Sequence, residues 1–192
     1  MRVIVSAHTG GPWEDISRIT WPAMKSYAER HGCKFLGLVL QPSCRPASWQ
    51  KLRCIAEAFV TSEEVLWLDA DVAVADESIS VFDVVAKDSH HAASVLKDVE
   101  GTVHHNMGVW LLRRQMLPYI VEAAMDDECV WHPWWEQAAL NKQIAAGLPT
   151  HSLGEEWNHW KGSPASITPR FRHACGIRDQ HERLSFLKDS LK

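Results

Sequence analysis

Three apolar runs separated by two helical patterns occupy about the first 70 residues, and this alternation limits the fold more than any other feature of the sequence. The runs are Val3–Val5, Lys34–Leu40 and Val65–Leu68. The third run is apolar throughout, which is typical of a strand buried on both faces of a parallel sheet. Strands that alternate with helices form parallel βαβ units, so the sequence predicts an α/β fold.

Two helices are expected between these strands. The first begins at Thr20, because proline (here Pro22) is tolerated in the first turn of a helix, and it ends near Gly32, which suits a left-handed cap. The second helix follows an N-cap at Ser48, and its apolar residues recur at i, i+3, i+4 and i+7. These residues are Leu52, Ile55, Ala56 and Phe59.

The second half of the chain is less regular. Strands are expected at 91–96 and 109–112, helices at 113–125, 134–146 and 181–191, and a loop from 151 onward. No internal repeat and no shift in composition marks a domain boundary, and 192 residues suit one domain with a sizeable core. We therefore predict a single domain over residues 1–192.

Composition excludes several classes of protein. With 46% hydrophobic and 23% charged residues the chain has the balance of a globular protein, and its net charge of −4 argues against general binding to nucleic acid or anionic membranes. The five cysteines are an odd number without a CxxC pair, so neither a disulfide framework nor a structural zinc site is expected. No stretch approaches the length of a membrane span. We expect a soluble, cytoplasmic protein.

The triplet Asp69-Ala70-Asp71 directly follows the apolar run 65–68. In an extended segment residues i and i+2 point to the same side, with Cα atoms roughly 6.5–7 Å apart. Ligands of open α/β sheets bind at the carboxyl ends of strands, and two close anions repel unless a cation lies near them. The triplet therefore indicates a divalent metal site, although an aspartate pair also serves simply to cap a following helix.

Three later motifs offer more polar groups, each with an ordinary structural alternative. Asn106 and Gly108 precede an apolar strand, where an amide suits sugar hydroxyls and glycine leaves room for a ligand, or where the chain merely turns. Glu136 and Gln137 open a helix, where a carboxylate also complements the helix dipole. His173 lies in a late loop and is one of eleven histidines, most of which we expect on the surface or in the core.

The order of these motifs resembles that of the GT-A glycosyltransferases. The segments that carry the resemblance are Tyr27–Gly32, Ser48–Lys51, Trp67–Asp71, Asn106–Gly108, Glu136–Leu140 and His173–Gly176. Within that fold the chain is most similar to the retaining galactosyl-, mannosyl- and xylosyltransferases of glycosyltransferase family 34. The resemblance spans nearly the whole chain and implies one Rossmann-like GT-A domain, with a mostly parallel, mixed central sheet flanked by helices.

The resemblance also implies a metal site and a donor site. Asp69 and Asp71 match the family's DxD motif, in which the second aspartate binds Mn²⁺ (or Mg²⁺) firmly and the first meets metal and ribose, while His173 matches the histidine that completes the metal site. Residues implied to be catalytic near the donor sugar are Glu136, Gln137 and Asn106. Residues implied to bind the rest of the donor are His8, Thr9, Gly10, Lys51, Asp69 and Gly108.

The implied activity is metal-dependent transfer of a hexose or pentose, with retention, from a UDP- or GDP-sugar to a glycan or another hydroxyl acceptor. Retention needs either a covalent glycosyl-enzyme or front-face attack within an ion pair, and Glu136 is the candidate for the group beneath the anomeric carbon. Family members generally carry a membrane anchor and a longer catalytic domain. Five of the ten tryptophans either form an acceptor platform or pack in the core: Trp131, Trp134, Trp135, Trp157 and Trp160.

Two other functions fit parts of the pattern. Haloacid-dehalogenase-like phosphatases also place a DxD after an apolar strand, with the first aspartate as nucleophile and Mg²⁺ as the metal, although that strand is usually the first in the chain. The other alternative is a carbohydrate- or nucleotide-binding protein that keeps the fold without turnover.

Overall fold

The computed structural model describes residues 1–97 and 103–191, and a six-stranded sheet runs through its centre. The three strands predicted in the first part of the chain are confirmed. They are β1 (Arg2–His8), β2 (Lys34–Val39) and β3 (Glu64–Leu68), with β1 parallel to both neighbours. Because all three point the same way, their carboxyl ends lie at one edge of the sheet.

The other half of the sheet is mixed. The strand β6 (Val103–Arg113) is antiparallel to β3, β5 (His91–Lys97) is antiparallel to β6, and β7 (Thr150–Leu153) is parallel to β5. The order across the sheet is β2-β1-β3-β6-β5-β7. This is the mixed α/β sheet that the sequence predicts, although β7 lies where a loop was expected.

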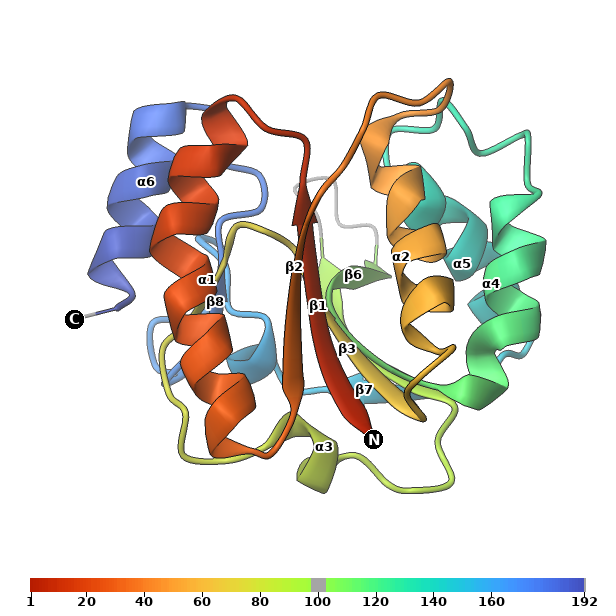
Figure 1. Ribbon diagram of the computed structural model, residues 1–192, viewed down its shortest axis with the longest axis horizontal. Coiled ribbons are helices and arrows are strands. Elements are labelled where there is room, and N and C mark those ends of the chain that lie inside the picture. Colours follow the sequence, from red (N-terminus) through yellow and green to blue (C-terminus); the bar gives the residue numbers. More distant parts are fainter. Residues whose placement is uncertain (98–102, 192) are drawn as a thin grey trace.

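Helices cover both faces of the sheet (Figure 1). One face carries α1 (Pro12–Arg30) and α6 (Gln180–Asp189), and the other carries α2 (Gln50–Ala58), α4 (Leu117–Ala124) and α5 (Glu136–Ala145). The remaining helical segments are α3 (Val81–Val84) and the 3₁₀ turns Ala47–Trp49, Arg114–Met116 and Glu155–Trp157. No helix in the described ranges is long and apolar enough to cross a membrane.

Alternation along the strands divides the core in two. Val65 and Trp67 of β3 join the cluster under α2, α4 and α5, whereas Leu66 and Leu68 join the cluster under α1. Successive side chains of a strand point to opposite faces, so one fully buried strand supplies both clusters. This strand therefore holds the residues that follow it at a fixed place on the sheet edge.

Two helix starts differ from the prediction. Helix α1 begins at Pro12 rather than Thr20, and Pro22 lies inside it. The backbone carbonyls of Gly10 and Gly11 accept bonds from the first turn, and proline suits the first helical position because its missing N–H has no partner there anyway. Ser48 is not an N-cap, because the 3₁₀ turn already begins at Ala47 and the Ser48 hydroxyl is buried without a hydrogen-bond partner.

A second, two-stranded sheet was not predicted. The short strand β4 (Val72–Val74) pairs antiparallel with β8 (Phe171–His173), and Val72 lies opposite His173. The strand β8 lies within the stretch that was expected to be a loop. This pairing brings the late part of the chain beside the Asp69–Asp71 segment.

Candidate active site

The Asp69–Asp71 segment forms a tight turn between β3 and β4 rather than the extended segment that we expected. The Val72 amide donates to the Asp69 carbonyl at 3.0 Å, which closes the turn. The Thr20 hydroxyl of α1 donates to the Ala70 carbonyl at 2.7 Å, and the Asp69 amide donates to the Gly108 carbonyl at 2.8 Å. The turn is therefore fixed by α1 on one side and by β6 on the other.

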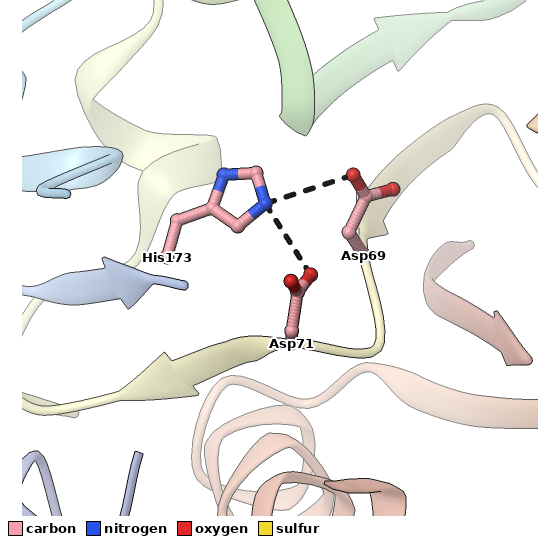
Figure 2. A group of neighbouring side chains, drawn as sticks. All are labelled: Asp69, Asp71 and His173. Carbon is pink, nitrogen blue, oxygen red and sulfur yellow. Dashed lines mark ion pairs between the residues drawn. The ribbon is translucent and has the colours of Figure 1, made fainter. Parts of the chain in front are cut away.

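Asp69, Asp71 and His173 form what we call the metal cluster (Figure 2). His173 Nε2 lies 3.3 Å from Asp71 Oδ1 and 3.8 Å from Asp69 Oδ2, and one ligand atom of each residue lies within 4.8 Å of the others. Asp71 and His173 are buried, whereas Asp69 is half-buried. The aspartates come from the end of β3, and β8 supplies the histidine.

The imidazole of His173 is held by Asn158, a residue that belongs to none of the sequence motifs. Asn158 is completely buried, its Oδ1 lies 2.9 Å from His173 Nδ1, and its Nδ2 donates to Asn106 Oδ1 at 2.9 Å. An amide oxygen only accepts, so the proton lies on His173 Nδ1 and Nε2 faces the two carboxylates. Metal-binding histidines are commonly oriented in this way by a partner on the other ring nitrogen.

The buried charges of the metal cluster stabilise one another. Burial alone raises the pKa of Asp71, but His173 and Arg183 outweigh it, so this pKa lies below its ordinary value. Burial lowers the pKa of His173, but Cys175 and Asp71 raise it well above its ordinary value. Two carboxylates and one imidazole nitrogen form a donor set that suits Mn²⁺ or Mg²⁺, and a divalent cation can take the place of the second proton of His173, on Nε2, while Nδ1 keeps its proton against Asn158.

Arg183 connects the C-terminal helix α6 to the metal cluster, and sequence reasoning missed it. Its guanidinium lies 3.7 Å from Asp71 Oδ2 and 4.9 Å from the centre of the Trp13 ring. Its side chain also donates to the Ile177 carbonyl. An arginine within a surface-like helical pattern gives no signal of this contact, because the contact depends on how α6 packs against α1.

Lys51, Asp69 and Glu136 form a second group of charges, which we call the lysine cluster. Lys51 Nζ lies 3.1 Å from Asp69 Oδ1 and 2.9 Å from Glu136 Oε1, and it donates to the Met107 carbonyl at 3.2 Å. The Trp67 indole also donates to Asp69 Oδ1, at 2.6 Å. Asp69 thus gives one oxygen to the lysine cluster and the other to the metal cluster.

Glu136 is the most unusual member of the lysine cluster. It is only 3% exposed, and its Oε2 is buried without a hydrogen-bond partner. Burial raises the pKa of Glu136, and the Lys51 ammonium offsets part of that rise. Burial lowers the pKa of Lys51, but Asp69 and Glu136 outweigh it and raise this pKa. Glu136 Oε2 therefore keeps an unused capacity to accept a hydrogen bond, at a position that is closed to solvent.

The other residues expected near the sugar border both clusters. Gln137 Oε1 accepts from the Met107 amide at 3.0 Å, and Asn106 Oδ1 accepts from the Gly108 amide at 2.9 Å. A Cβ on Gly108 would lie 2.1 Å from His173 Cε1, so only glycine fits beside the imidazole. The structure therefore brings Asn106, Gly108, Glu136 and Gln137 to the edge where the metal cluster lies.

The first loop lies at the carboxyl end of β1, beside the end of β3. The buried His8 accepts from the Gly10 amide at 2.9 Å through Nδ1, and its ring lies 4.9 Å from that of Trp21. Thr9 lines a cavity of about 290 Å³ together with the segment that follows β2. The residues around this cavity are Thr9, Leu40, Gln41, Pro42, Ser43, Arg45, Ala47 and Gln50.

Several solved structures that are similar to this chain are glycosyltransferases. One is involved in the glycosylation of the major capsid of PBCV-1, with a TM-score of 0.80, 18% identity and 98% of each chain covered. A second is galactosyltransferase LgtC in complex with donor and acceptor sugar analogs, with a TM-score of 0.64, 16% identity, and 100% of this chain and 96% of that chain covered.

A third is GlyE of Streptococcus pneumoniae TIGR4, with a TM-score of 0.61 and 16% identity, where 97% of this chain matches 60% of that chain. No protein-family model and no curated protein matches the sequence. Identities this low show the fold alone. The chain therefore has the mixed α/β fold of the GT-A glycosyltransferases.

Proposed function

We propose that this chain is a metal-dependent glycosyltransferase, which moves a hexose or pentose from a UDP- or GDP-sugar to a glycan or another hydroxyl acceptor. The observation that carries the proposal is the convergence of Asp69, Asp71 and His173 within 4.8 Å at the carboxyl edge of β3. Ligands bind at this edge in open α/β sheets. The glycosyltransferase fold of the solved neighbours supports the same assignment.

In this proposal the metal cluster holds Mn²⁺ or Mg²⁺. The bound ion supplies positive charge to the donor diphosphate, where negative charge grows as the sugar leaves. Asp71 and His173 are the buried ligands, and Asn158 keeps the His173 ring in place. Asp69 keeps Oδ2 for the metal because Lys51 and Trp67 bind its Oδ1.

The lysine cluster lies on the sugar side of the proposed site. Glu136 is the group beneath the anomeric carbon. There its unpartnered oxygen accepts a hydrogen bond from a sugar hydroxyl or stabilises positive charge on the sugar ring. Lys51, whose Nζ lies 2.9 Å from Glu136 Oε1, offsets part of the rise in the Glu136 pKa that burial causes. Asn106, Gly108 and Gln137 line the sugar pocket, and transfer occurs with retention, as in the family 34 enzymes that the chain resembles.

In this proposal the nucleoside of the donor binds against the loop that follows β1. His8, Thr9 and Gly10 lie against the base and ribose, and the cavity of about 290 Å³ beside Thr9 offers space for them. The parallel pairing of β1 with β3 supports this position, because it brings the loop to the edge that carries Asp69.

A thermal-shift panel tests the proposed function. UDP- and GDP-sugars are added with and without Mn²⁺, and a ligand at 100 times its dissociation constant stabilises the fold by about 2.7 kcal/mol. Asp71→Asn should lower the affinity for Mn²⁺ by at least roughly 100-fold, beyond the losses seen when outer-shell partners are removed. The matched control is Asp88→Asn, which changes an exposed aspartate before β5 at the opposite sheet edge.

The same experiment separates the alternatives. A donor-dependent, Mn²⁺-dependent shift followed by release of nucleoside diphosphate supports the transferase. A shift without release points to the non-catalytic binding protein, and a beryllofluoride adduct on Asp69, which mimics an aspartyl-phosphate, points to the phosphatase. Full Mn²⁺ affinity in Asp71→Asn would remove the metal site from the proposal.

A further inference from the structure

Only two of the five tryptophans expected in an acceptor platform are well exposed. Trp131 is 77% and Trp135 is 45% exposed. Trp157 is buried with its ring 5.3 Å from that of Phe171, and Trp134 stacks on His104 with ring centres 4.2 Å apart. Trp160 is half-buried. The expectation of five platform residues therefore reduces to Trp131 and Trp135, which we call the tryptophan platform.

The backbone of Trp135 has a conformation that is unusual for a residue with a side chain. Among residues 1–97 and 103–191, it is the only non-glycine residue with a positive φ, at φ 45° and ψ −126°. The N-cap of α1 has nearly the same conformation, φ 59° and ψ −131°, and there the residue is Gly11. Glycine adopts this conformation readily, whereas a residue with a Cβ is strained in it.

The surrounding contacts hold Trp135 in that conformation. Its amide donates to the His132 carbonyl at 2.9 Å, and its carbonyl accepts from the Ala138 amide at 3.0 Å. The Trp134 amide donates to His132 Nδ1 at 3.1 Å. Glycine would meet the same backbone demand without strain, so the indole is the feature of this position that the backbone does not explain.

The position of Trp135 suggests a ligand. It directly precedes Glu136, whose carboxylate is tied to Lys51 and has one free buried oxygen. A half-exposed indole on the residue before a buried, charge-paired glutamate suits a sugar ring, because the apolar face of such a ring can cover the indole while its hydroxyls remain free to meet polar partners. A wholly apolar ligand would offer no hydrogen bond to Glu136 Oε2, the one oxygen of the lysine cluster that lacks a partner.

We propose that Trp135, assisted by Trp131, is the stacking surface for a pyranose ring of the acceptor. This inference rests on the proposed transferase function, because it assigns the acceptor to the side of the lysine cluster where α5 begins. It also specifies the acceptor class as a saccharide, among the hydroxyl compounds that the proposed function allows.

Direct binding tests the platform without any donor. The protein is labelled at the tryptophan indole nitrogens, and its NMR spectrum is followed while methyl β-galactoside, methyl α-glucoside or methyl β-xyloside is added. We expect the Trp131 and Trp135 indole signals, assigned with Trp131→Ala and Trp135→Phe, to shift with at least one of these glycosides. If no glycoside moves either signal, the platform proposal is wrong.

Kinetics with the donor found in the panel provide the second readout. Trp135→Gly removes the indole and the strain together, and it should raise the acceptor KM by about tenfold, which is near the lower end of the loss measured when a base loses its aromatic stacking partner. Its affinity for Mn²⁺ and donor should stay within about twofold of the parent protein. Trp135→Phe keeps a smaller aromatic ring, so its acceptor KM should lie between those of the parent protein and Trp135→Gly. The control is Val60→Ala, which changes an exposed apolar residue beyond the end of α2.

The outcomes distinguish this inference from the proposed function. Saccharide-induced indole shifts in a protein that releases no nucleoside diphosphate support the platform and contradict the transferase. Turnover in which Trp135→Gly leaves the acceptor KM unchanged supports the transferase and overturns the platform.

Discussion

The two charged clusters that share Asp69 balance their charge in different ways. In the lysine cluster Lys51 lies between two carboxylates, within 3.1 Å of both. In the metal cluster the charge of Asp71 is met by His173 at 3.3 Å and, from farther away, by Arg183 at 3.7 Å. Lys51 keeps its proton over the whole working range of pH, because its pKa is raised.

This difference separates a permanent cation from a replaceable one. The proton on His173 can leave when a metal ion arrives, whereas the lysine cluster has its cation built into α2. Removing a member of the lysine cluster should therefore affect folding first, and removing a member of the metal cluster should affect ligand affinity first. Variants of Lys51 and Asn158 and the pH dependence of metal binding distinguish the effect on folding from the effect on ligand affinity.

Lys51→Met should destabilise the fold by about 3–5 kcal/mol, because it leaves the buried Glu136 carboxylate without its cation. Urea unfolding measures the loss. The double variant Lys51→Met with Glu136→Gln should recover a large part of it, because the uncompensated charge is then gone as well. A loss below about 1 kcal/mol in the single variant would show that Lys51 is not essential to this buried charge balance.

Asn158→Ala should raise the dissociation constant for Mn²⁺ roughly 10- to 100-fold, because His173 loses the partner that fixes its ring. Isothermal titration calorimetry measures the change. The matched control is Asn141→Ala, since Asn141 also bridges to β6, through His105, but lies outside the metal cluster. Equal losses of Mn²⁺ affinity in both variants would contradict a specific role for Asn158.

The pH dependence should differ between the metal-free and the metal-bound protein. The pKa of His173 in the folded state is raised above its ordinary value of 6.5, so its stabilisation of the metal-free fold is complete below pH 6.5 and is lost as the pH rises through the raised pKa. Mn²⁺ must displace that proton. Its affinity should therefore increase by about tenfold for each pH unit below the raised pKa.

Calorimetry in two buffers with different heats of ionisation counts the proton that Mn²⁺ releases, and urea unfolding with a chelator follows the metal-free fold. Release of no proton at pH 6 would show that His173 is already neutral, or that it is not a ligand. Because Lys51 stays charged throughout, Lys51 itself should add nothing to this count.

Sequence reasoning succeeded where the signal was local. The apolar run before Asp69 predicted both β3 and the sheet edge that carries the aspartates, because a buried strand can be recognised from a few consecutive residues. The predicted start of α1 at Thr20 is wrong, because Pro12, directly after the two glycines, occupies the first turn and Pro22 lies inside the helix. Both proline positions satisfy a local rule, and tertiary packing decides between them.

Contacts between distant parts of the chain were not predictable in the same way. The Lys51–Glu136 pair joins α2 to α5, and the Asn158–His173 contact joins a 3₁₀ turn to a three-residue strand. Neither Asn158 nor Arg183 belongs to a sequence pattern. The resemblance to GT-A enzymes pointed to Lys51, Glu136 and His173 without showing how they meet, and the structure supplies the two clusters that connect them.

The pairing of β4 with β8 has a consequence for how the protein is made. Val72 leaves the ribosome about a hundred residues ahead of His173, its partner across the small sheet. During synthesis Asp69 and Asp71 are therefore present before His173 is. A nascent chain cannot bind a metal ion through all three side chains until β8 has emerged and paired with β4. The proposed metal site therefore forms only in chains that have been synthesised past residue 173.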